Sequence, residues 1–363
     1  MSTDPTLDIV ASFNTGPADL APGLSEAAAE IAASGLLALS HRGDAVKAAV
    51  AHAIAETRRA LRVPEDYAVV TQPSATASME LALRNLVRER SAHFVGGAFG
   101  KRFADSAAAI GLAPHRIEHE WSAAPEIDAP VPDGTELLSV THNETSTGML
   151  WPAEALTQLR ERLGADHPDT LLAVDATSSM GGVAIDFSSA DLWFASVQKA
   201  LGLPAGLALV IAGPRALERA AALGADRRVA PWQDLPVMAE KMKTGQTFDT
   251  PNIFGLALLG RAMEGRSIDD SAHHSCALSG MLVRAVEDGR LDAEWFVEDR
   301  AWRSTTVHNL EVADPAEAIR RARRAGFVIG SGYRNLKDRC IRIATFPAHR
   351  DEHLETLLAS LAS

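Results

Sequence analysis

The sequence has 363 residues, of which 47% are hydrophobic and 23% charged, a globular composition that excludes a disordered or low-complexity chain. Its 35 basic and 47 acidic residues leave a formal net charge of −12, which argues against nucleic acid or an anionic membrane as a partner. Only two cysteines and no apolar run of membrane-spanning length are present, so we expect a cytoplasmic protein without a disulfide framework or a transmembrane helix.

Short apolar strands alternate with helices along the first two thirds of the chain. In chain order, we expect a helix at Asp44–Leu61, a strand at Tyr67–Thr71, a helix at Thr76–Val87, strands at Ala92–Val95, Arg116–Glu118 and Leu137–Thr141, a helix at Ala153–Leu163, and strands at Leu171–Asp175, Leu192–Val197 and Leu207–Ile211. This alternation is typical of a mostly parallel sheet with helices on both faces. Ligands of such sheets bind beyond the carboxyl ends of the strands, so the residues that end the strands are candidate site residues.

The pattern changes after Gly255, where helices are no longer separated by single buried strands. Helices are expected at Ala257–Glu264, Ala272–Val286, Pro315–Ala325 and Glu352–Leu361, with strands at Thr305–Val312 and Ile341–Phe346. These elements predict a smaller α+β domain. We therefore expect a large α/β domain over residues 1–255 and a small domain over 256–363.

An acid and a lysine follow two neighbouring apolar strands. Asp175 ends one strand, and Lys199 follows the next, just before a turn that contains Gly202 and Gly206. A pyridoxal phosphate site requires this pair, because the lysine amine forms a Schiff base with the aldehyde and the carboxylate pairs with the protonated ring nitrogen. The ordinary alternatives are a solvated surface lysine and an acid in a turn or helix cap.

Two further segments suit a phosphorylated aromatic ligand. Ser74 and Thr76 join a strand to a helix, where hydroxyls and helix amides would seat a phosphate, although the same residues also suit a plain helix cap. Phe99 follows Gly96 and Gly97 and is a candidate to stack on a planar ring, with a core position as the alternative.

Seven short motifs along the chain, two of which contain Asp175 and Lys199, carry a further signal. They are FNTGP at 13–17, SHR at 40–42, HNETSTG at 142–148, VDATSSMGG at 174–182, SVQKALG at 196–202, DTPN at 249–252, and GYRNLKDRCIRIATFPAH at 332–349. Together they resemble the class-V aminotransferases of fold type I over nearly the whole chain, and among these the phosphoserine aminotransferases most. The resemblance implies an α/β fold with a mostly parallel seven-stranded sheet in the large domain and a smaller α+β carboxyl-terminal domain. It also implies pyridoxal 5′-phosphate as cofactor and a homodimer with shared active sites.

The resemblance also implies roles for individual residues toward the cofactor. Lys199 would be the Schiff-base lysine, Asp175 the partner of the ring nitrogen, and Thr145 the partner of the 3-hydroxyl group. The remaining cofactor contacts would come from Ser74, Ala75, Thr76 and Gln198 at the phosphate, from Phe99 on the ring, and from Thr250 and Asn252 of a second subunit. Phe99 stands where phosphoserine aminotransferases usually have tryptophan.

Four residues would bind the substrate if the resemblance holds. Arg342 would hold the substrate carboxylate, a role that suits the planar guanidinium group, and His41, Arg42 and Arg334 would hold the substrate phosphate. Tyr333 stands where the family has a second histidine. The implied reaction converts 3-phosphohydroxypyruvate and glutamate to phosphoserine and 2-oxoglutarate, in serine biosynthesis. A surface or salt-bridging arginine is the alternative for Arg42 and Arg334, and serine–glyoxylate or alanine–glyoxylate aminotransferase is the alternative activity.

Three other functions are weighed against this one. A cysteine desulfurase usually has histidine before the lysine, whereas Gln198 stands here, and Cys340 beside the last strand suits a packed thiol. The run His115–His119 spells the zinc motif His-x-x-Glu-His, but it follows a proline in an expected strand, where the histidines cannot share a helix face, so no metal site is predicted. A non-catalytic protein of this fold would be expected to lack Lys199 or Asp175.

Overall fold

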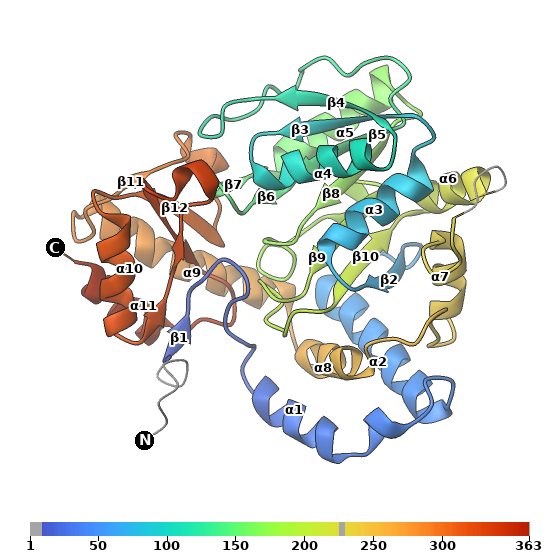
Figure 1. The fold of residues 1–363 in the computed structure, drawn as a ribbon, viewed down its shortest axis with the longest axis horizontal. Helices are drawn as coiled ribbons and strands as arrows, with labels where there is room; N and C mark the ends of the chain where they lie inside the picture. The colour runs from blue at the N-terminus through green and yellow to red at the C-terminus, as the bar shows by residue number, and fades with distance from the viewer. Residues whose placement is uncertain (1–8, 225–228, 363) are drawn as a thin grey trace.

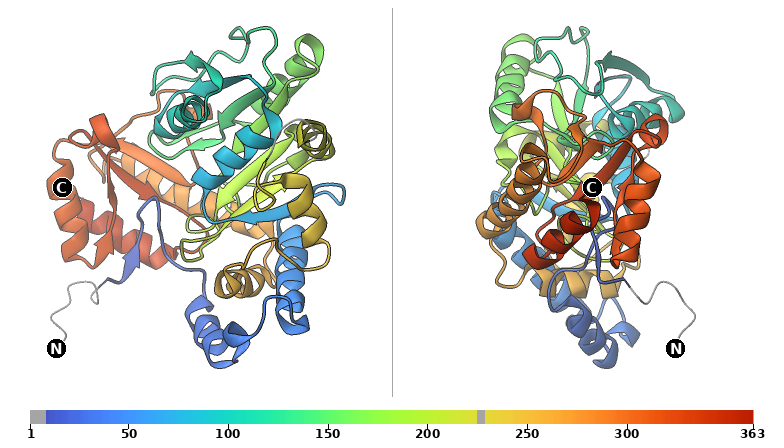
Figure 2. Two further views of the ribbon diagram at one scale, coloured as in Figure 1. Left: turned by 45° about the vertical axis from the view of Figure 1, so that its right-hand side comes forward. Right: turned by 90° about the vertical axis from the view of Figure 1, so that its left-hand side faces the viewer.

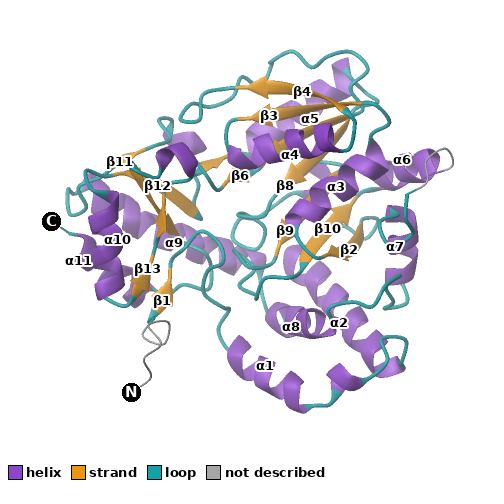
Figure 3. Ribbon diagram, viewed as in Figure 1, coloured by secondary structure: helices purple, strands orange, loops and turns teal. Residues whose placement is uncertain are grey.

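A seven-stranded sheet forms the centre of the large domain in the computed structural model, which describes residues 9–224 and 229–362 (Figures 1 and 3). Its strands are β2 (Ala68–Gln72), β3 (Arg90–Val95), β4 (Ala113–Glu118), β5 (Leu137–Thr141), β8 (Leu171–Asp175), β9 (Leu192–Ser196) and β10 (Ala208–Ala212). They lie in the order β2-β10-β9-β8-β5-β3-β4, and β10 is antiparallel to both of its neighbours while the other pairs are parallel. The mostly parallel seven-stranded sheet expected from the sequence is confirmed.

Helices cover both faces of this sheet. One face carries α3 (Ala75–Leu86), α4 (Ala98–Ala109), α6 (Pro214–Gly224) and α7 (Leu235–Met242), and the other carries α2 (Asp44–Leu61), α5 (Ala153–Asp166) and α8 (Ile253–Met263), with α1 (Leu24–Ala33) packed on α8. Along β8, Leu171 and Ala173 join one apolar core, whereas Leu172 and Val174 join the other. Alternate residues are therefore buried on opposite faces, which explains why the strands of this sheet are apolar throughout.

The small domain is built around a second, antiparallel sheet, which lies to the left in Figure 1. Its strands are β11 (Glu294–Trp295), β12 (Val307–Glu311), β14 (Gly330–Ser331) and β15 (Cys340–Ala344), and its helices are α9 (Ile268–Glu287), α10 (Pro315–Arg324) and α11 (Asp351–Leu361). Leu278 of α9, Ile341 of β15 and Leu354 of α11 meet in its apolar core.

The amino-terminal segment runs between the two domains (Figures 1 and 2). Its short strand β1 (Ala11–Ser12) pairs in parallel with β13 (Phe327–Val328) of the small domain. Farther along, the Ala21 amide donates to the Gly202 carbonyl of the large domain at 2.8 Å. The segment between these points therefore passes the carboxyl ends of the central strands.

Most expected elements are confirmed, and α2 has the bounds that the sequence predicts. Helices α1, α4, α6 and α7 were not predicted. Helix α7 has an Asp234 cap and a proline in its first turn, which is a local signal that sequence reasoning missed. Helix α4 begins after Gly97 without a cap from a neighbouring side chain. None of the described helices is long and apolar enough to cross a membrane.

Candidate active site

The carboxyl ends of the central strands open into a cavity of about 250 Å³ beside the small domain. Nine of the residues predicted to contact cofactor or substrate line it: Ser74, Ala75, Thr76, Phe99, Thr145, Asp175, Gln198, Lys199 and Arg342. The structure brings these nine together from six stretches of the chain, which places them where a ligand of an open α/β sheet binds.

Lys199 lies inside this cavity and is only 6% exposed, so the alternative of a surface lysine is wrong. Its Nζ donates to Thr145 Oγ1 at 2.7 Å and to Ser178 Oγ at 3.0 Å. Burial lowers its pKa to about 8, although Asp175 and Glu144 act in the opposite direction. About a tenth of the amine is therefore neutral at pH 7, and about half at pH 8, where it is able to act as a nucleophile or base.

Asp175 is the buried acid of the cavity, at 3% exposure. Thr177 donates to its carboxylate from the backbone amide, at 2.9 Å, and from the hydroxyl. Burial raises the pKa of Asp175 more than these hydrogen bonds and Lys199 lower it. A buried carboxylate of this kind favours a cationic N–H partner.

The amino terminus of α3 faces the same cavity. Ser74 caps the helix by accepting from the Ala77 amide at 3.2 Å, and the Ala75 amide donates to Ser196 Oγ at 2.6 Å. The amide of Thr76 has no partner within the described part of the chain. The helix cap is thus confirmed, and the Thr76 amide and hydroxyl are available to an anion.

Glu144 fixes a second wall of the cavity by capping α4 from a distance. It lies on β6 (Asn143–Glu144), and its Oε2 accepts from the amides of Phe99 and Gly100 at 3.0 and 3.1 Å. This cap places the Phe99 ring with its centroid 5.0 Å from Lys199 Nζ, so Phe99 lines the cavity and is not a core residue.

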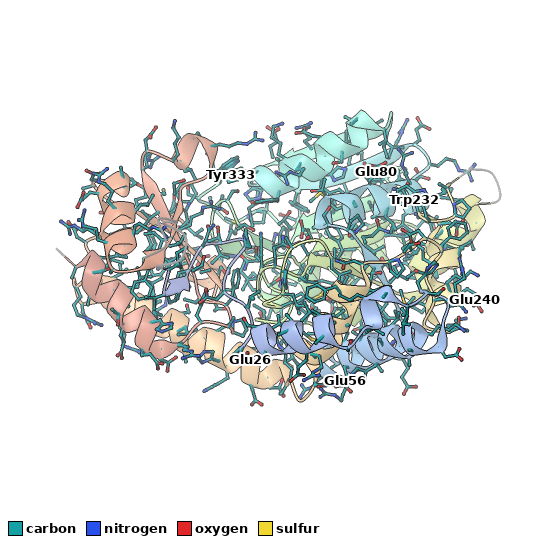
Figure 4. The ribbon with its side chains drawn as sticks, turned by 60° about the horizontal axis from the view of Figure 1, so that its bottom comes forward. Glu26, Glu56, Glu80, Trp232, Glu240 and Tyr333 are labelled. Carbon is teal, nitrogen blue, oxygen red and sulfur yellow. The ribbon has the colours of Figure 1, made fainter. Side chains whose placement is uncertain are left out.

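The side of the cavity toward the small domain is lined by Arg102, Arg342 and Tyr333, the last of which is labelled in Figure 4. Arg342 of β15 donates from Nε to the Ser331 carbonyl at 2.8 Å and from Nη1 to the Thr145 carbonyl at 3.1 Å. Burial lowers its pKa. Arg102 of α4 donates to Tyr333 Oη at 3.4 Å, and sequence reasoning did not find it because it did not predict α4.

Sequence reasoning also missed two residues that hold Lys199. Ser178 bonds its amine, and Gly16 lies so close that a Cβ there would be 2.7 Å from Lys199 Cε. Both stand inside motifs that carry the family resemblance, so the motifs themselves were the available signal.

The other predicted residues lie outside the cavity of Lys199. Thr250 and Asn252 line a separate cavity of about 210 Å³, and Asn252 caps α8 by accepting from the Gly255 amide at 2.9 Å. Arg42, which follows His41, donates to Gln246 Oε1 at 3.4 Å and to the Phe248 carbonyl at 3.5 Å. These four predicted residues therefore belong to adjoining segments of one protomer.

Arg334 is exposed at the start of a short 3-10 helix, Arg334–Leu336. It has a φ of 51°, in the left-handed region that non-glycine residues rarely adopt. Among the described residues no acid forms an ion pair with it, so the alternative of a salt-bridging arginine is wrong for Arg334.

The donors and acceptors of the cavity fit pyridoxal phosphate. Thr141 Oγ1 and Asn143 Oδ1 are buried at its base without a hydrogen-bond partner. These orphaned atoms, the buried Asp175 carboxylate and the Thr76 amide offer partners to a polar ring that carries a phosphate. Lys199 supplies the amine that an aldehyde requires.

The alternative sites do not have the geometry that their chemistry needs. Cys340 is fully buried in β15, and burial raises the pKa of its thiol to about 11, which confirms a packed thiol and excludes an activated thiolate. His115 and Glu118 lie on strand β4, as expected, so the His-x-x-Glu-His run is not on a helix. The described residues contain no group of three His, Cys, Asp or Glu side chains suited to a metal.

Comparisons with known proteins agree with this chemistry. The family model described as aminotransferase class-V matches residues 12–319. A curated phosphoserine aminotransferase from Nocardioides sp. is 31% identical over 366 aligned residues, which cover 96% of this chain and 94% of that protein. A solved phosphoserine aminotransferase from Cytophaga hutchinsonii is 30% identical, with a TM-score of 0.92 and 98% of both chains covered. The alanine–glyoxylate aminotransferase from Nostoc sp. is 23% identical with a TM-score of 0.81, covering 97% of this chain and 94% of that one, a likeness of fold.

Proposed function

The chain belongs to the class-V aminotransferases, and on that premise we propose that it transfers an amino group from glutamate to 3-phosphohydroxypyruvate, with pyridoxal phosphate as cofactor. It is a transaminase with the fold type I architecture expected from the sequence. The observation that carries the proposal is the convergence of the buried Lys199 and Asp175 with the half-buried Arg342 on one cavity. The phosphorylated substrate is supported by the relatives named phosphoserine aminotransferase, which are about 30% identical to this chain over nearly their full length.

Pyridoxal phosphate, when bound, supplies the aldehyde that takes up the amino group and a ring that accepts electrons. Lys199, neutral in part near pH 8, takes the proton from the α-carbon of the amino acid at its Nζ. Asp175 keeps the ring nitrogen protonated, since a buried carboxylate gains most from a cationic N–H partner. Ser74, Ala75, Thr76 and Gln198 would hold the phosphate, Thr145 the 3-hydroxyl group, and Phe99 the ring face.

Arg342 would bind the α-carboxylate of the substrate. Its Nε and Nη1 are held by two backbone carbonyls, so the guanidinium has a fixed orientation at the wall of the cavity. A carboxylate accepts charge-assisted hydrogen bonds from such a group, and these anchor the amino acid with little loss of side-chain freedom.

We further propose that two copies of the chain share their active sites. His41, Arg42, Thr250 and Asn252 lie on adjoining segments outside the cavity of Lys199, where they would complete the cavity of a partner. Large apolar side chains are exposed on the same segments or at the rim of the second cavity, namely Leu37, Leu39, Phe248 and Trp232, the last of which Figure 4 labels. Exposed apolar groups gathered in this way suit an interface.

Two further expectations stay predictions. We propose residues 1–255 and 256–363 as the two domains, although α8 packs on α2 of the large domain and β1 pairs within the small one. The cytoplasmic location expected from the composition likewise stays a prediction.

Loading of the cofactor should depend on pH through Lys199. Because only the neutral amine attacks the aldehyde, and the pKa of Lys199 is lowered to about 8, the rate should rise about tenfold per pH unit below this value and level off above it. The visible absorbance of bound pyridoxal phosphate, followed after mixing with cofactor-free protein, measures this rate. A free lysine side chain, with its pKa of 10.5, is the control. A rate that keeps rising to pH 10 would contradict the lowered pKa.

The substrate assignment is tested by comparing phosphoserine with serine. In single-turnover reactions of the pyridoxal form, the specificity constant should be higher for phosphoserine, and Arg42→Ala should lower it about tenfold to hundredfold through loss of one charge-assisted contact. The specificity constant for serine should change little on this substitution. Arg59→Ala is the control, because Arg59 lies on the helix that follows Arg42 but lines neither the cavity of Lys199 nor that of Thr250. A preference for serine or alanine with glyoxylate as acceptor would instead assign the glyoxylate-linked activity.

A further inference from the structure

We infer that Arg102, together with Tyr333, binds the second anionic group of the substrate from within the same protomer. The inference deepens the proposed function and rests on it, because it assumes an amino acid that carries an anion on its side chain. Arg102 lines the cavity of Lys199 from α4, whereas Arg342 lines it from β15. The two arginines therefore present two positive charges to one ligand.

Arg102 has no anionic partner in residues 9–224 and 229–362. Its neighbour Lys101 pairs with Asp105 at 2.8 Å, and Arg116 pairs with the same carboxylate at 2.7 Å. No acid in the described part of the chain forms an ion pair with Arg102 itself. A half-buried guanidinium group without a counter-charge at the wall of a cavity favours an anionic ligand.

Aromatic groups hold Arg102 in place. Its Cζ lies 4.9 Å from the centroid of the Phe99 ring, and it donates to Tyr333 Oη at 3.4 Å. Glu144 caps the first turn of α4, which fixes the helix that carries both Arg102 and Phe99. The guanidinium is thus positioned before substrate arrives, so binding costs little side-chain entropy.

The two arginines suit different groups of the substrate. Arg342 donates to the carbonyl of Thr145 at 3.1 Å, and the hydroxyl of the same Thr145 accepts from Lys199 Nζ at 2.7 Å, whereas Arg102 donates to Tyr333. The α-carboxylate is attached to the carbon that loses its proton to Lys199, so it belongs with Arg342, the arginine bonded to the residue that holds the amine. The side-chain anion then falls to Arg102 and to the Tyr333 hydroxyl, which keeps its own proton to donate.

Three variants of the holoenzyme test this assignment. Arg102→Met keeps much of the packing on Phe99 but removes the charge, Arg102→Lys keeps the charge, and Lys101→Met removes a neighbouring charge that Asp105 already pairs. The readout is the ratio of single-turnover specificity constants for glutamate and for its neutral isostere glutamine. Arg102→Met should lower this ratio tenfold or more, Arg102→Lys should restore part of it, and Lys101→Met should leave it unchanged.

A binding measurement provides a readout that does not depend on turnover. The dissociation constant of glutarate, which has two carboxylates, should rise about tenfold in Arg102→Met when measured by calorimetry. The dissociation constant of butyrate, which has one carboxylate, should not change. Equal losses for glutamate and glutamine, or an unchanged ratio, would overturn the inference. If Arg102→Met lowers the ratio for glutamate over glutamine but the wild-type enzyme does not favour phosphoserine over serine, the phosphorylated substrate is wrong and the role of Arg102 stands.

Discussion

Replacing Lys199 by alanine should abolish useful transamination and leave a folded protein that still binds pyridoxal phosphate without a covalent bond. One side chain supplies both the amine that anchors the cofactor and the base that moves the α-proton, and loss of general-base catalysis alone costs about 10²–10⁴-fold. The side chain is held by hydroxyls of Thr145 and Ser178 in a cavity, so its removal takes away little apolar packing. The loss of transamination is measured as turnover with glutamate. Circular dichroism tests whether the variant is folded, and retention of the cofactor on dialysis tests whether it still binds.

Lys101→Ala is the matched control for this substitution. Lys101 is a partly exposed lysine that pairs with Asp105 and does not line the cavity. Its removal should leave both turnover and retention of cofactor at wild-type values. Near-normal turnover in Lys199→Ala would remove Lys199 from its assigned role.

Asp175→Asn is expected to slow proton abstraction by roughly three powers of ten while the cofactor remains bound. The amide keeps the size of the side chain and can still accept from the Thr177 amide, but it lacks the charge that holds the ring nitrogen protonated. Stopped-flow absorbance of the half-reaction with glutamate measures the step directly.

The same substitution should not destabilise the cofactor-free protein. Burial raises the pKa of Asp175, so the fold itself disfavours the charged form, and a neutral amide of equal size relieves that cost. The expected melting temperature is therefore equal to or above that of the wild type. A wild-type half-reaction rate in Asp175→Asn would mean that another acid pairs with the ring.

Local patterns in the sequence were enough to predict the strands of the central sheet and five of the nine predicted residues that line the cavity, whereas the family resemblance was needed for Ala75, Thr145, Gln198 and Arg342. Apolar strands separated by helices gave the sheet, and the rule that ligands bind at strand ends selected Asp175 and Lys199. Asp175 is the last residue of β8 and Lys199 stands three residues after the end of β9, so their positions depend on few torsions beyond the sheet. The structure places both in one cavity.

The wall formed by α4 could not be predicted in this way. Its first turn is capped by Glu144, which lies 45 residues from Phe99 in the sequence, so no local signal marks where the helix begins. Without the helix there was no reason to place Arg102 beside Tyr333. A contact that joins distant segments is decided by tertiary packing, which periodicity does not record.

The left-handed backbone of Arg334 is another feature that the sequence does not announce. The residue types that usually signal such a conformation are glycine, asparagine and aspartate, and none of them stands there. Likewise, the sequence of one chain cannot show which residues, such as Arg42 and Thr250, would act across a pair of chains.

The pairing of the amino-terminal segment with the small domain has a consequence for the order in which a newly made chain can mature on the ribosome. Residues 11–16 are synthesised about 300 residues before their partners, because β1 pairs with β13 (Phe327–Val328) and the Phe13 carbonyl accepts from the Ala344 amide at 2.8 Å. Gly16, which packs on Lys199, follows directly. The wall of the Lys199 cavity that contains Gly16, Tyr333 and Arg342 can therefore assemble only after the ribosome has added residue 344.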